Sequence, residues 1–289
     1  MHEFTFQAAT SIAQAVELLA REGEQARVLC GGTDLLIQMR NGARRPRLLV
    51  DVKSIPELRA LSYDPKTGLC LGAAVPCIEI SESPLMRRYY PGLSEAAHLI
   101  GSLQIQQRAS VGGNLCNASP AADTSPALLA LDARVRIAGP GGQRELAVTQ
   151  FFAGPGRNVL GAGEFVTQIL IEPPAAHSAD CYLRLIPRNE MDIAIVGAGA
   201  AIALEGQRCV AARLALGAVA PTPILAAQAA AALVGQPLDE GAIERAVALV
   251  RAAAQPIDDM RGSANYRRQV AGVLARRAIL KAAARAREN

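Results

Sequence analysis

The first 55 residues alternate between short apolar runs and polar breaks, at spacings typical of short helices and strands. Apolar residues recur at helical spacing after Ser11, a favourable N-cap, and predict a helix that ends near Arg21. A strand, a break at two adjacent glycines, a short helix and a second strand are predicted next, at Arg27–Cys30, Gly31-Gly32, Leu35–Arg40 and Leu48–Val52. These elements indicate a small α/β unit over about residues 1–55.

From residue 56 to residue 175 the pattern predicts strands and helices in no regular alternation. The strands are Leu69–Ala73, Arg134–Ile137, 144–148 and Phe165–Ile171, and the helical segments lie near 77–90, 92–100 and Ala127–Leu131. The turn residues Gly139-Pro140-Gly141-Gly142 predict a hairpin before the strand at 144–148. The segment Ser110–Pro120 is rich in small and polar residues and is predicted to be a loop.

The last part of the chain, residues 176–289, separates its strands from its helices. Three strands are predicted at Tyr182–Ile186, Ile193–Leu204 and Val210–Val219, and three helices near 225–234, 239–253 and 263–287, with Ser263 as the cap of the last. Because strands and helices do not alternate along the chain, we expect an α+β fold with a three-stranded antiparallel sheet here, and not one large parallel sheet.

Composition narrows the class of protein. The chain has 289 residues, of which 51% are hydrophobic, and a net charge of +4 without a long basic run, which gives no indication of a nucleic-acid partner. The N-terminus lacks the basic start and apolar core of a signal peptide. The longest uncharged apolar stretch, Ile193–Leu204, is shorter than the roughly 20 residues of a membrane span. We therefore expect a soluble, cytoplasmic protein.

Metal binding by this chain is not indicated. The six cysteines show no CxxC spacing and have no histidines at zinc-site distance, so we expect reduced, mostly buried thiols. The three histidines are scattered along the sequence, at His2, His98 and His177.

The first segment with chemical potential lies between a predicted strand and a predicted helix: Leu29-Cys30-Gly31-Gly32-Thr33-Asp34-Leu35-Leu36. Adjacent glycines let the backbone turn sharply and approach a ligand, and successive free N–H groups in such a turn bind anions. A diphosphate suits this site. Asp34 would repel it, so Asp34 or Thr33 is expected to cap the helix. The alternative is a plain strand–turn–helix connection.

The second segment is Ser110-Val111-Gly112-Gly113-Asn114, followed by Ala118-Ser119-Pro120-Ala121-Ala122-Asp123. Two glycine-containing segments about 80 residues apart suggest the two ends of one extended ligand. Asp123 has two possible roles of similar weight: it can accept hydrogen bonds from sugar or ribityl hydroxyls, or it can cap the helix that starts near Pro126.

No residues form a recognisable acid–base or nucleophilic site. The stretch Gly197-Ala198-Gly199-Ala200-Ala201-Ile202 begins like a GxGxxG nucleotide motif, but it lacks the third glycine and a following helix, so a strand packed with small residues is expected. GxSxG, HExxH and P-loop lysine motifs are absent from the sequence. We therefore predict no catalytic side chain, as expected where a bound cofactor carries the chemistry.

These residues resemble the flavin-binding medium subunit of the molybdenum hydroxylases, the family of xanthine dehydrogenase, carbon monoxide dehydrogenase and 4-hydroxybenzoyl-CoA reductase. The resemblance covers nearly the whole chain. The segments that match are the two glycine segments, Pro126-Ala127-Leu128-Leu129, Arg188 with Asp192-Ile193-Ala194, and Asp259-Met260-Arg261-Gly262-Ser263-Ala264-Asn265-Tyr266-Arg267. It implies a two-subdomain FAD-binding fold of the vanillyl-alcohol oxidase type in residues 1–175, divided near residue 55, and a C-terminal flavoprotein domain in residues 176–289.

The resemblance also implies which residues approach FAD. They are Leu29, Cys30, Gly31, Gly32, Thr33, Asp34 and Leu35 around the diphosphate, then Ile100, Gly101, Ser110, Gly113, Asn114, Cys116, Ser119, Asp123, Val166 and Arg184. A basic residue such as Arg184 can stabilise negative charge on reduced flavin. Two departures stand out: Cys30 replaces an alanine of many relatives, and Asn114 runs into Ala118–Asp123 without the cysteine-bearing insert of the benzoyl-CoA reductases, which argues against a 4Fe–4S cluster in this chain.

The implied function is electron transfer in an oxidoreductase complex. A large molybdopterin-binding subunit would oxidise the substrate, a small 2Fe-2S subunit would pass electrons to FAD in this chain, and FAD would pass them to NAD+ or another acceptor, in a dimer of heterotrimers (a heterohexamer). Two alternatives remain: a stand-alone flavin oxidoreductase, and an assembly or scaffold subunit that has lost flavin.

Overall fold

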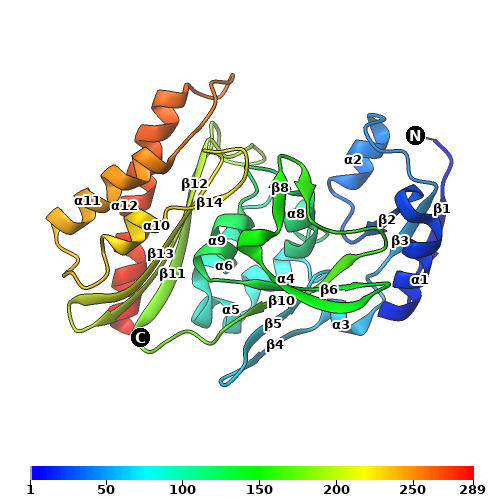
Figure 1. The fold of residues 1–289 in the computed structure, drawn as a ribbon, viewed down its shortest axis with the longest axis horizontal. Helices are drawn as coiled ribbons and strands as arrows, with labels where there is room; N and C mark the ends of the chain where they lie inside the picture. The colour runs from blue at the N-terminus through cyan, green and yellow to red at the C-terminus, as the bar shows by residue number, and fades with distance from the viewer. Residues whose placement is uncertain (1) are drawn as a thin grey trace.

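Three hydrophobic clusters follow one another along the computed structural model, which describes residues 2–289. Figure 1 shows the corresponding parts in a row, from the blue N-terminal part to the orange and red C-terminal helices. Neighbouring clusters share side chains: Phe165 of the central part joins the N-terminal cluster, and Tyr182 and Ala215 of the C-terminal part join the central one. Each part is thereby packed against the next.

The N-terminal part is a three-stranded parallel sheet in the order β1-β3-β2 with one long helix. Its elements are β1 (Thr5–Ala8), α1 (Ile12–Glu22), a 3-10 turn (Gly23–Gln25), β2 (Ala26–Leu29), α2 (Leu35–Arg40) and β3 (Leu48–Asp51). Ser11 caps α1 as predicted, because its hydroxyl accepts a hydrogen bond from the Gln14 amide at 3.2 Å. The strand β1 is not among the predicted elements, and its four residues are all exposed, so no apolar alternation marks it.

The central part is built on a five-stranded antiparallel sheet in the order β4-β5-β10-β6-β7. The strands are β4 (Leu61–Asp64), β5 (Gly68–Gly72), β6 (Arg134–Gly139), β7 (Gly142–Ala147) and β10 (Phe165–Ile171), with a small hairpin of β8 (Phe152–Gly154) and β9 (Arg157–Asn158). The helices are α3 (Pro56–Arg59), α4 (Cys77–Glu82), α5 (Pro84–Tyr89), α6 (Pro91–His98), α7 (Leu103–Gln106), α8 (Val111–Asn117) and α9 (Thr124–Ala130), with a 3-10 turn (Val148–Gln150). The predicted hairpin β6–β7 and strand β10 are confirmed.

The prediction of a loop over Ser110–Pro120 is wrong for most of that segment, because α8 occupies Val111–Asn117. The Ser110 hydroxyl caps α8 by accepting a hydrogen bond from the Gly113 amide at 3.0 Å. The neighbouring Gly112 lies against the backbone of Ala73, where an added Cβ would come within 2.5 Å of a carbonyl oxygen. The glycines of α8 have low helix propensity, so the helix depends on this tertiary contact with Ala73.

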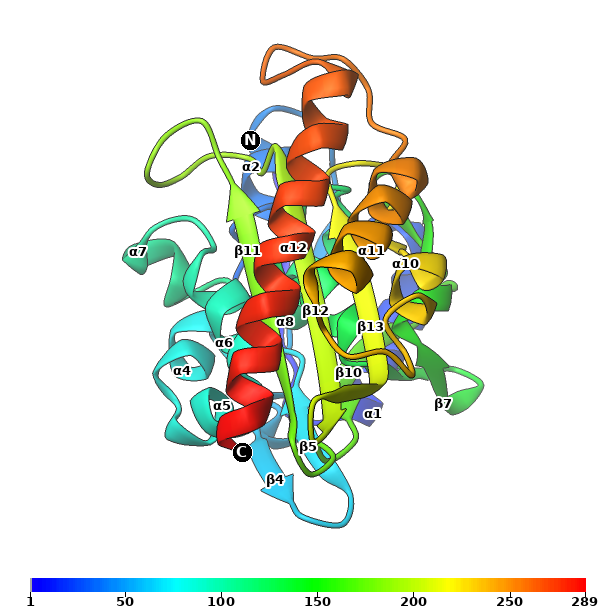
Figure 2. The ribbon, with the colours of Figure 1, turned by 90° about the vertical axis from the view of Figure 1, so that its left-hand side faces the viewer.

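The C-terminal part has a four-stranded antiparallel sheet in the order β11-β12-β13-β14, and not the predicted three strands. Its elements are β11 (Ser178–Leu185), β12 (Val196–Glu205), β13 (Arg208–Gly217), β14 (Ile224–Leu225), α10 (Ala227–Ala231), α11 (Glu240–Ala253) and α12 (Ala264–Glu288). The fourth strand is only two residues long and pairs with Ala215 and Leu216, which is too short for a sequence pattern to predict it. Figure 2 shows α12 lying across the face of this sheet.

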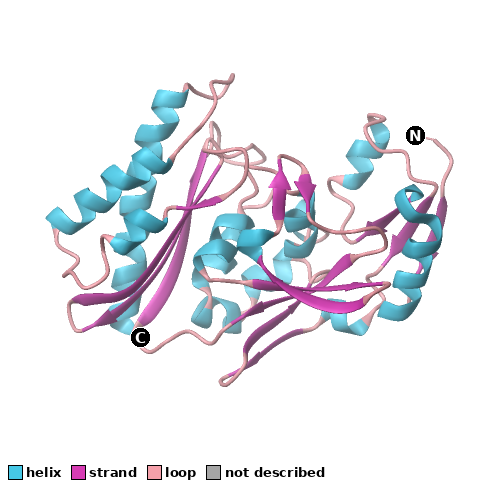
Figure 3. Cartoon of the chain, viewed as in Figure 1, coloured by secondary structure: helices cyan, strands magenta, loops and turns pink. Residues whose placement is uncertain are grey.

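The fold is α+β, as predicted, with helices packed on one parallel sheet and on two larger antiparallel sheets (Figure 3). The Gly197–Ile202 stretch lies within β12, where a Cβ on Gly199 would meet the Pro126 carbonyl oxygen at 2.6 Å. The expectation of a strand packed with small residues is confirmed. Among residues 2–289 we find no helix with the length and apolar character needed to cross a membrane.

Charged side chains join the C-terminal helix α12 to helix α6 of the central part. The carboxylate of Glu95 on α6 pairs with Arg285 and with Lys281, the latter at 2.7 Å, and accepts a hydrogen bond from the Tyr182 amide. Next to it, Asp180 on β11 accepts a hydrogen bond from the Leu93 amide at 3.2 Å. Burial raises the pKa of Asp180 to about 7, and hydrogen bonds from the α6 amides offset this only in part.

We expect an Asp180→Asn substitution to remove a pH dependence of folding. In the wild-type chain Asp180 holds a proton in the folded state up to about pH 7, but in the unfolded state only up to about pH 4. The folded state therefore binds more protons in this window, and the contribution of Asp180 to stability falls as the pH rises from about 4 to 7. Denaturant unfolding across this range should show that the variant gains stability relative to wild type as the pH rises.

Glu95 provides the control of opposite sign. Burial opposes ionisation of Glu95, but hydrogen bonds from Arg285 and Lys281 outweigh it and lower its pKa. A Glu95→Gln variant should therefore lose stability at neutral pH and approach wild type as the pH falls through the acid range. Parallel pH profiles for the two variants would contradict this account of the α6–α12 contact.

Candidate functional site

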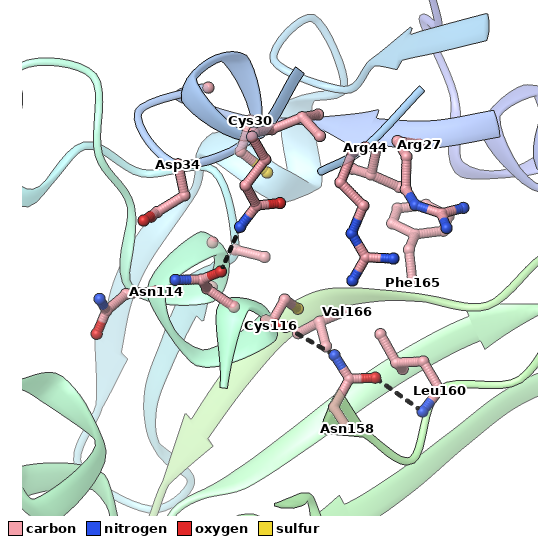
Figure 4. A pocket seen from close by; sticks show the side chains of 18 of the residues that line it. Arg27, Cys30, Asp34, Arg44, Asn114, Cys116, Asn158, Leu160, Phe165 and Val166 are labelled. Atoms are coloured by element: carbon pink, nitrogen blue, oxygen red, sulfur yellow. Dashed lines mark hydrogen bonds between the residues drawn. The ribbon is translucent and has the colours of Figure 1, made fainter. Parts of the chain in front are cut away.

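A cavity of about 870 Å³ lies between the N-terminal part and the central part of the chain. Its walls come from the segment between β2 and α2, from α8, and from the segment between β9 and β10 (Figure 4). This volume is within the range of pockets that hold drug-sized ligands and cofactors. The two glycine segments, far apart in the sequence, face the same cavity.

The first wall presents a row of free backbone N–H groups. None of the amides of the five consecutive residues Gly31–Leu35 donates a hydrogen bond to any residue from 2 to 289. Five adjacent donors without acceptors form the kind of concavity that binds a phosphate group. Gly32 adopts a positive φ of 78°, and Gly31 packs so closely that an added Cβ would lie 1.7 Å from the Arg108 carbonyl oxygen. Glycine is therefore required at both positions.

The second wall is the first turn of α8. Gly113 faces the cavity, and an added Cβ there would meet only the Ser110 hydroxyl, at 3.1 Å. The side of Gly113 away from Ser110 is therefore open to a ligand. A hydrogen bond of 3.0 Å from Gln38 of α2 to Asn117 of α8 connects the two walls, and Asn158 donates to the Cys116 carbonyl at 2.7 Å (Figure 4). These bonds fix the width of the cleft.

Two expected helix caps are absent. Asp34 stands at the N-cap position of α2, but neither its side chain nor that of Thr33 accepts a capping hydrogen bond within the described residues. Asp123 likewise precedes α9 without capping it. The capping role considered for both aspartates is therefore wrong. Asp34 remains beside the free amides, and partial burial raises the pKa of its carboxyl above the ordinary value.

Twelve of the seventeen predicted cofactor-binding residues line the cavity: Cys30, Gly31, Gly32, Thr33, Asp34, Leu35, Ile100, Ser110, Gly113, Asn114, Cys116 and Val166. Five do not: Leu29, Gly101, Ser119, Asp123 and Arg184. Leu29 and Gly101 adjoin lining residues in the chain. The other three, Ser119, Asp123 and Arg184, are not next to any lining residue in the chain.

Asp123 and Arg184 form a buried group with Tyr182. Asp123 accepts hydrogen bonds from the Tyr182 hydroxyl at 2.8 Å and from Arg184 Nη1 at 2.6 Å. Burial raises the pKa of Asp123 despite the charge of Arg184 beside it. The Arg184 side chain is only 6% exposed, and its Nε has no hydrogen-bond partner among residues 2–289. This buried donor lies outside the lining of the cavity.

A hydrogen bond connects this buried group to the cavity. Thr124, the residue after Asp123, donates from its hydroxyl to the Asn114 side-chain oxygen at 2.7 Å. Asn114 itself lines the cavity. Asn114 therefore contacts both the cavity and the helix that follows Asp123.

Cys30 and Cys116 face the cavity as thiols. Burial raises the pKa of Cys30 to about 11 and that of Cys116 to about 12. Both therefore remain protonated near neutral pH and do not act as nucleophiles there. All six cysteines are free, and residues 2–289 contain no group of three or more potential ligands that could hold a metal ion.

Sequence reasoning missed one end of the cavity. Arg27, Arg44, Asn158 and the segment 160–165 also form its lining. Arg27 stands two residues before the first glycine segment, and Arg44 lies in the arginine-rich stretch 40–47. The basic stretch 40–47 near the expected phosphate site is the only sequence feature that points to this end of the cavity. It does not specify which of its arginines faces the cavity.

Comparison with known proteins gives full-length matches. Residues 2–174 match the family described as the FAD binding domain in molybdopterin dehydrogenase, and residues 181–282 match the CO dehydrogenase flavoprotein C-terminal domain. The chain is 34% identical to the carbon monoxide dehydrogenase medium chain of Afipia carboxidovorans, with 98% of both chains covered. It is 31% identical to the putative xanthine dehydrogenase FAD-binding subunit of Escherichia coli K12, covering 98% of this chain and 97% of that one.

The fold is shared as well. A chain in the solved structure of reconstituted CO dehydrogenase from Oligotropha carboxidovorans superposes with a TM-score of 0.94 at 34% identity. The superposition covers 98% of this chain and 99% of that chain.

Proposed function

Because the chain belongs to the family of FAD-binding subunits of molybdenum hydroxylases, we propose that its cleft holds FAD and passes electrons between the partners of an oxidoreductase complex. The observation that carries this proposal is the row of five unbonded amides at Gly31–Leu35, facing the open side of Gly113 across one cavity. A diphosphate satisfies these donors, and the size of the cavity suits a dinucleotide.

The chain's own residues place and tune the cofactor. The Gly31–Leu35 amides hold the diphosphate, and glycine at 113 lets the ligand approach the α8 backbone. Asn114 offers an oxygen to ribityl hydroxyls, and we place the ion pair of Asp123 and Arg184 beyond Asn114, toward the flavin end. Bound flavin supplies redox chemistry that links one-electron and two-electron carriers. No side chain has to act as an acid, a base or a nucleophile.

The finer assignments follow from this role. We propose that electrons arrive from a small 2Fe-2S subunit, that a large molybdopterin-binding subunit oxidises the substrate, and that NAD+ or another acceptor receives the electrons. We further propose a cytoplasmic dimer of heterotrimers. Within the chain, residues 1–175 would form the two FAD-binding subdomains of the vanillyl-alcohol oxidase type, and residues 176–289 the C-terminal domain. Full-length similarity to a medium chain and to an FAD-binding subunit supports this arrangement.

Spectroscopy of the full-length chain, purified with any chains that accompany it, tests FAD binding. We expect a flavin absorption band at about 450 nm, lost on removal of the cofactor and restored by added FAD. Added FAD should also raise the midpoint of thermal unfolding, since it binds the folded state.

The two alternatives give different results. A chain that shows no flavin band even after FAD is added would favour the flavin-free scaffold. A chain that catalyses full turnover without partner subunits would favour the stand-alone oxidoreductase. Sequencing of the neighbouring reading frames gives a further check, because a molybdopterin-type chain and a chain with a 2Fe-2S pattern are expected there.

A further inference from the structure

The cavity has a second end that the predicted site does not include. In Figure 4, Asp34 and Asn114 lie on one side, Arg27, Arg44 and Phe165 on the other, and Cys30 between them. On the first side, Asn114 accepts a hydrogen bond from Thr124, the residue after Asp123, and Asp123 in turn pairs with Arg184. The other side is lined by Gly23, Glu24, Ala26, Arg27, Arg44 and the segment 161–165. The free amides at Gly31–Leu35 thus lie between two different ends.

Two arginines at the second end, Arg27 and Arg44, form no ion pair with a described residue, although Glu24 and Glu164 also line this end of the cavity. Within residues 2–289, no carboxylate lies within ion-pair distance of Arg27 or Arg44. Arg27 donates from Nη1 only to backbone oxygens, those of Glu24 at 3.0 Å and Ala26 at 2.7 Å. The Arg44 guanidinium makes no hydrogen bond to a described residue. Its position leaves it free to turn toward a ligand.

The two guanidinium groups are close enough to affect each other. Burial lowers the pKa of Arg27, the charge of Arg44 lowers it further, and the charge of Glu24 raises it in part. Like charges held together in a partly dry site are unfavourable unless an anion or an aromatic π face binds there. An adenosine diphosphate offers both: negative phosphate oxygens and a flat adenine ring.

We propose that Arg44, supported by Arg27, binds the adenosine-diphosphate half of FAD and makes the cleft select the dinucleotide over FMN. The inference rests on the proposed function and adds residues that determine specificity within it. The phosphates occupy the free amides, the flavin half extends toward Asp123 and Arg184, and the adenosine half extends toward the two arginines. There a guanidinium plane can stack on adenine or pair with a phosphate oxygen. FMN ends before it reaches this region.

Arg45 offers a matched control for Arg44. It is the next residue, carries the same charge and is also exposed, but it does not line the cavity. The experiment compares Arg44→Gln with Arg45→Gln in the full-length protein, purified with any accompanying chains and freed of flavin. Dissociation constants are measured for FAD, FMN and ADP by flavin fluorescence and calorimetry, and thermal unfolding checks that both variants fold.

The expected result is selective. Arg44→Gln should weaken FAD and ADP about 10-fold and leave FMN unchanged, whereas Arg45→Gln should change none of the three. The salt dependence of FAD affinity should also be smaller in Arg44→Gln, because one cation no longer contacts the ligand. A uniform loss for FAD and FMN, or equal behaviour of the two variants, would overturn this inference and leave the proposed function intact. A wild-type protein that binds no FAD would overturn both.

Discussion

A Gly113→Leu variant is expected to fold but to lose FAD. The added side chain leaves the α8 backbone on the side that is open to the cavity, where only the Ser110 hydroxyl lies near the new Cβ. It therefore occupies the space of the ligand. A steric clash between the leucine side chain and FAD costs about 3 kcal/mol, which weakens FAD binding about 100-fold. Leucine also has a higher helix propensity than glycine, so thermal unfolding of the flavin-free chain should be unchanged or slightly raised.

The neighbouring glycine gives the opposite outcome. A Cβ on Gly112 would lie 2.5 Å from the Ala73 carbonyl oxygen, on the packed side of α8. Gly112→Ala should therefore destabilise the fold itself, by about 1–3 kcal/mol, and affect FAD only through folding. Circular dichroism and flavin titration separate the two effects. If Gly113→Leu bound FAD like wild type, the α8 backbone would not be a wall of the flavin site.

An Arg267→Ala variant is expected to lose about 3 kcal/mol of unfolding free energy. Arg267 is only 4% exposed and holds three segments of the C-terminal part together. Its guanidinium donates to the carbonyls of Ile195 at 2.8 Å and Ala218 at 3.1 Å, and pairs with Asp259 at 2.6 Å. Removal leaves two carbonyls without a donor and a cavity beneath them. Denaturant unfolding of the full-length chain measures the loss.

The adjacent residue again provides the comparison. Arg268 is exposed and makes a single long hydrogen bond, to the Ala254 carbonyl at 3.3 Å. Arg268→Ala should change stability by no more than about 0.5 kcal/mol. Equal losses in the two variants would mean that burial and hydrogen bonding of Arg267 do not set its contribution.

Elements with a local physical cause were predictable from sequence. Ser11 and Ser263 cap α1 and α12 with their own hydroxyls, so the starts of both helices are encoded within one turn. The glycine pair at 31–32 ends β2 because a positive φ is required at Gly32. The strand Phe165–Ile171 is an apolar-rich run with two polar residues, Thr167 and Gln168, and its predicted bounds are confirmed.

Elements that depend on distant partners were not predictable. The strand β1 has four exposed side chains and exists because its backbone pairs with β3. The strand β14 is fixed only by two residues of β13. The helix α8 depends on the close approach of Gly112 to Ala73. In each case the stabilising contact comes from a residue far along the chain, so no local periodicity records it.

The sequence alone identified both glycine segments and the free amides between β2 and α2, because backbone freedom at glycine is a local property, and it predicts a diphosphate there. Only the tertiary structure decided that Asp123 pairs with Tyr182 and Arg184 instead of capping α9, and that Arg27 and Arg44 form the second end of the cavity. Charge pairing and burial are set by distances between side chains, and those distances exist only once the N-terminal, central and C-terminal parts have packed against one another.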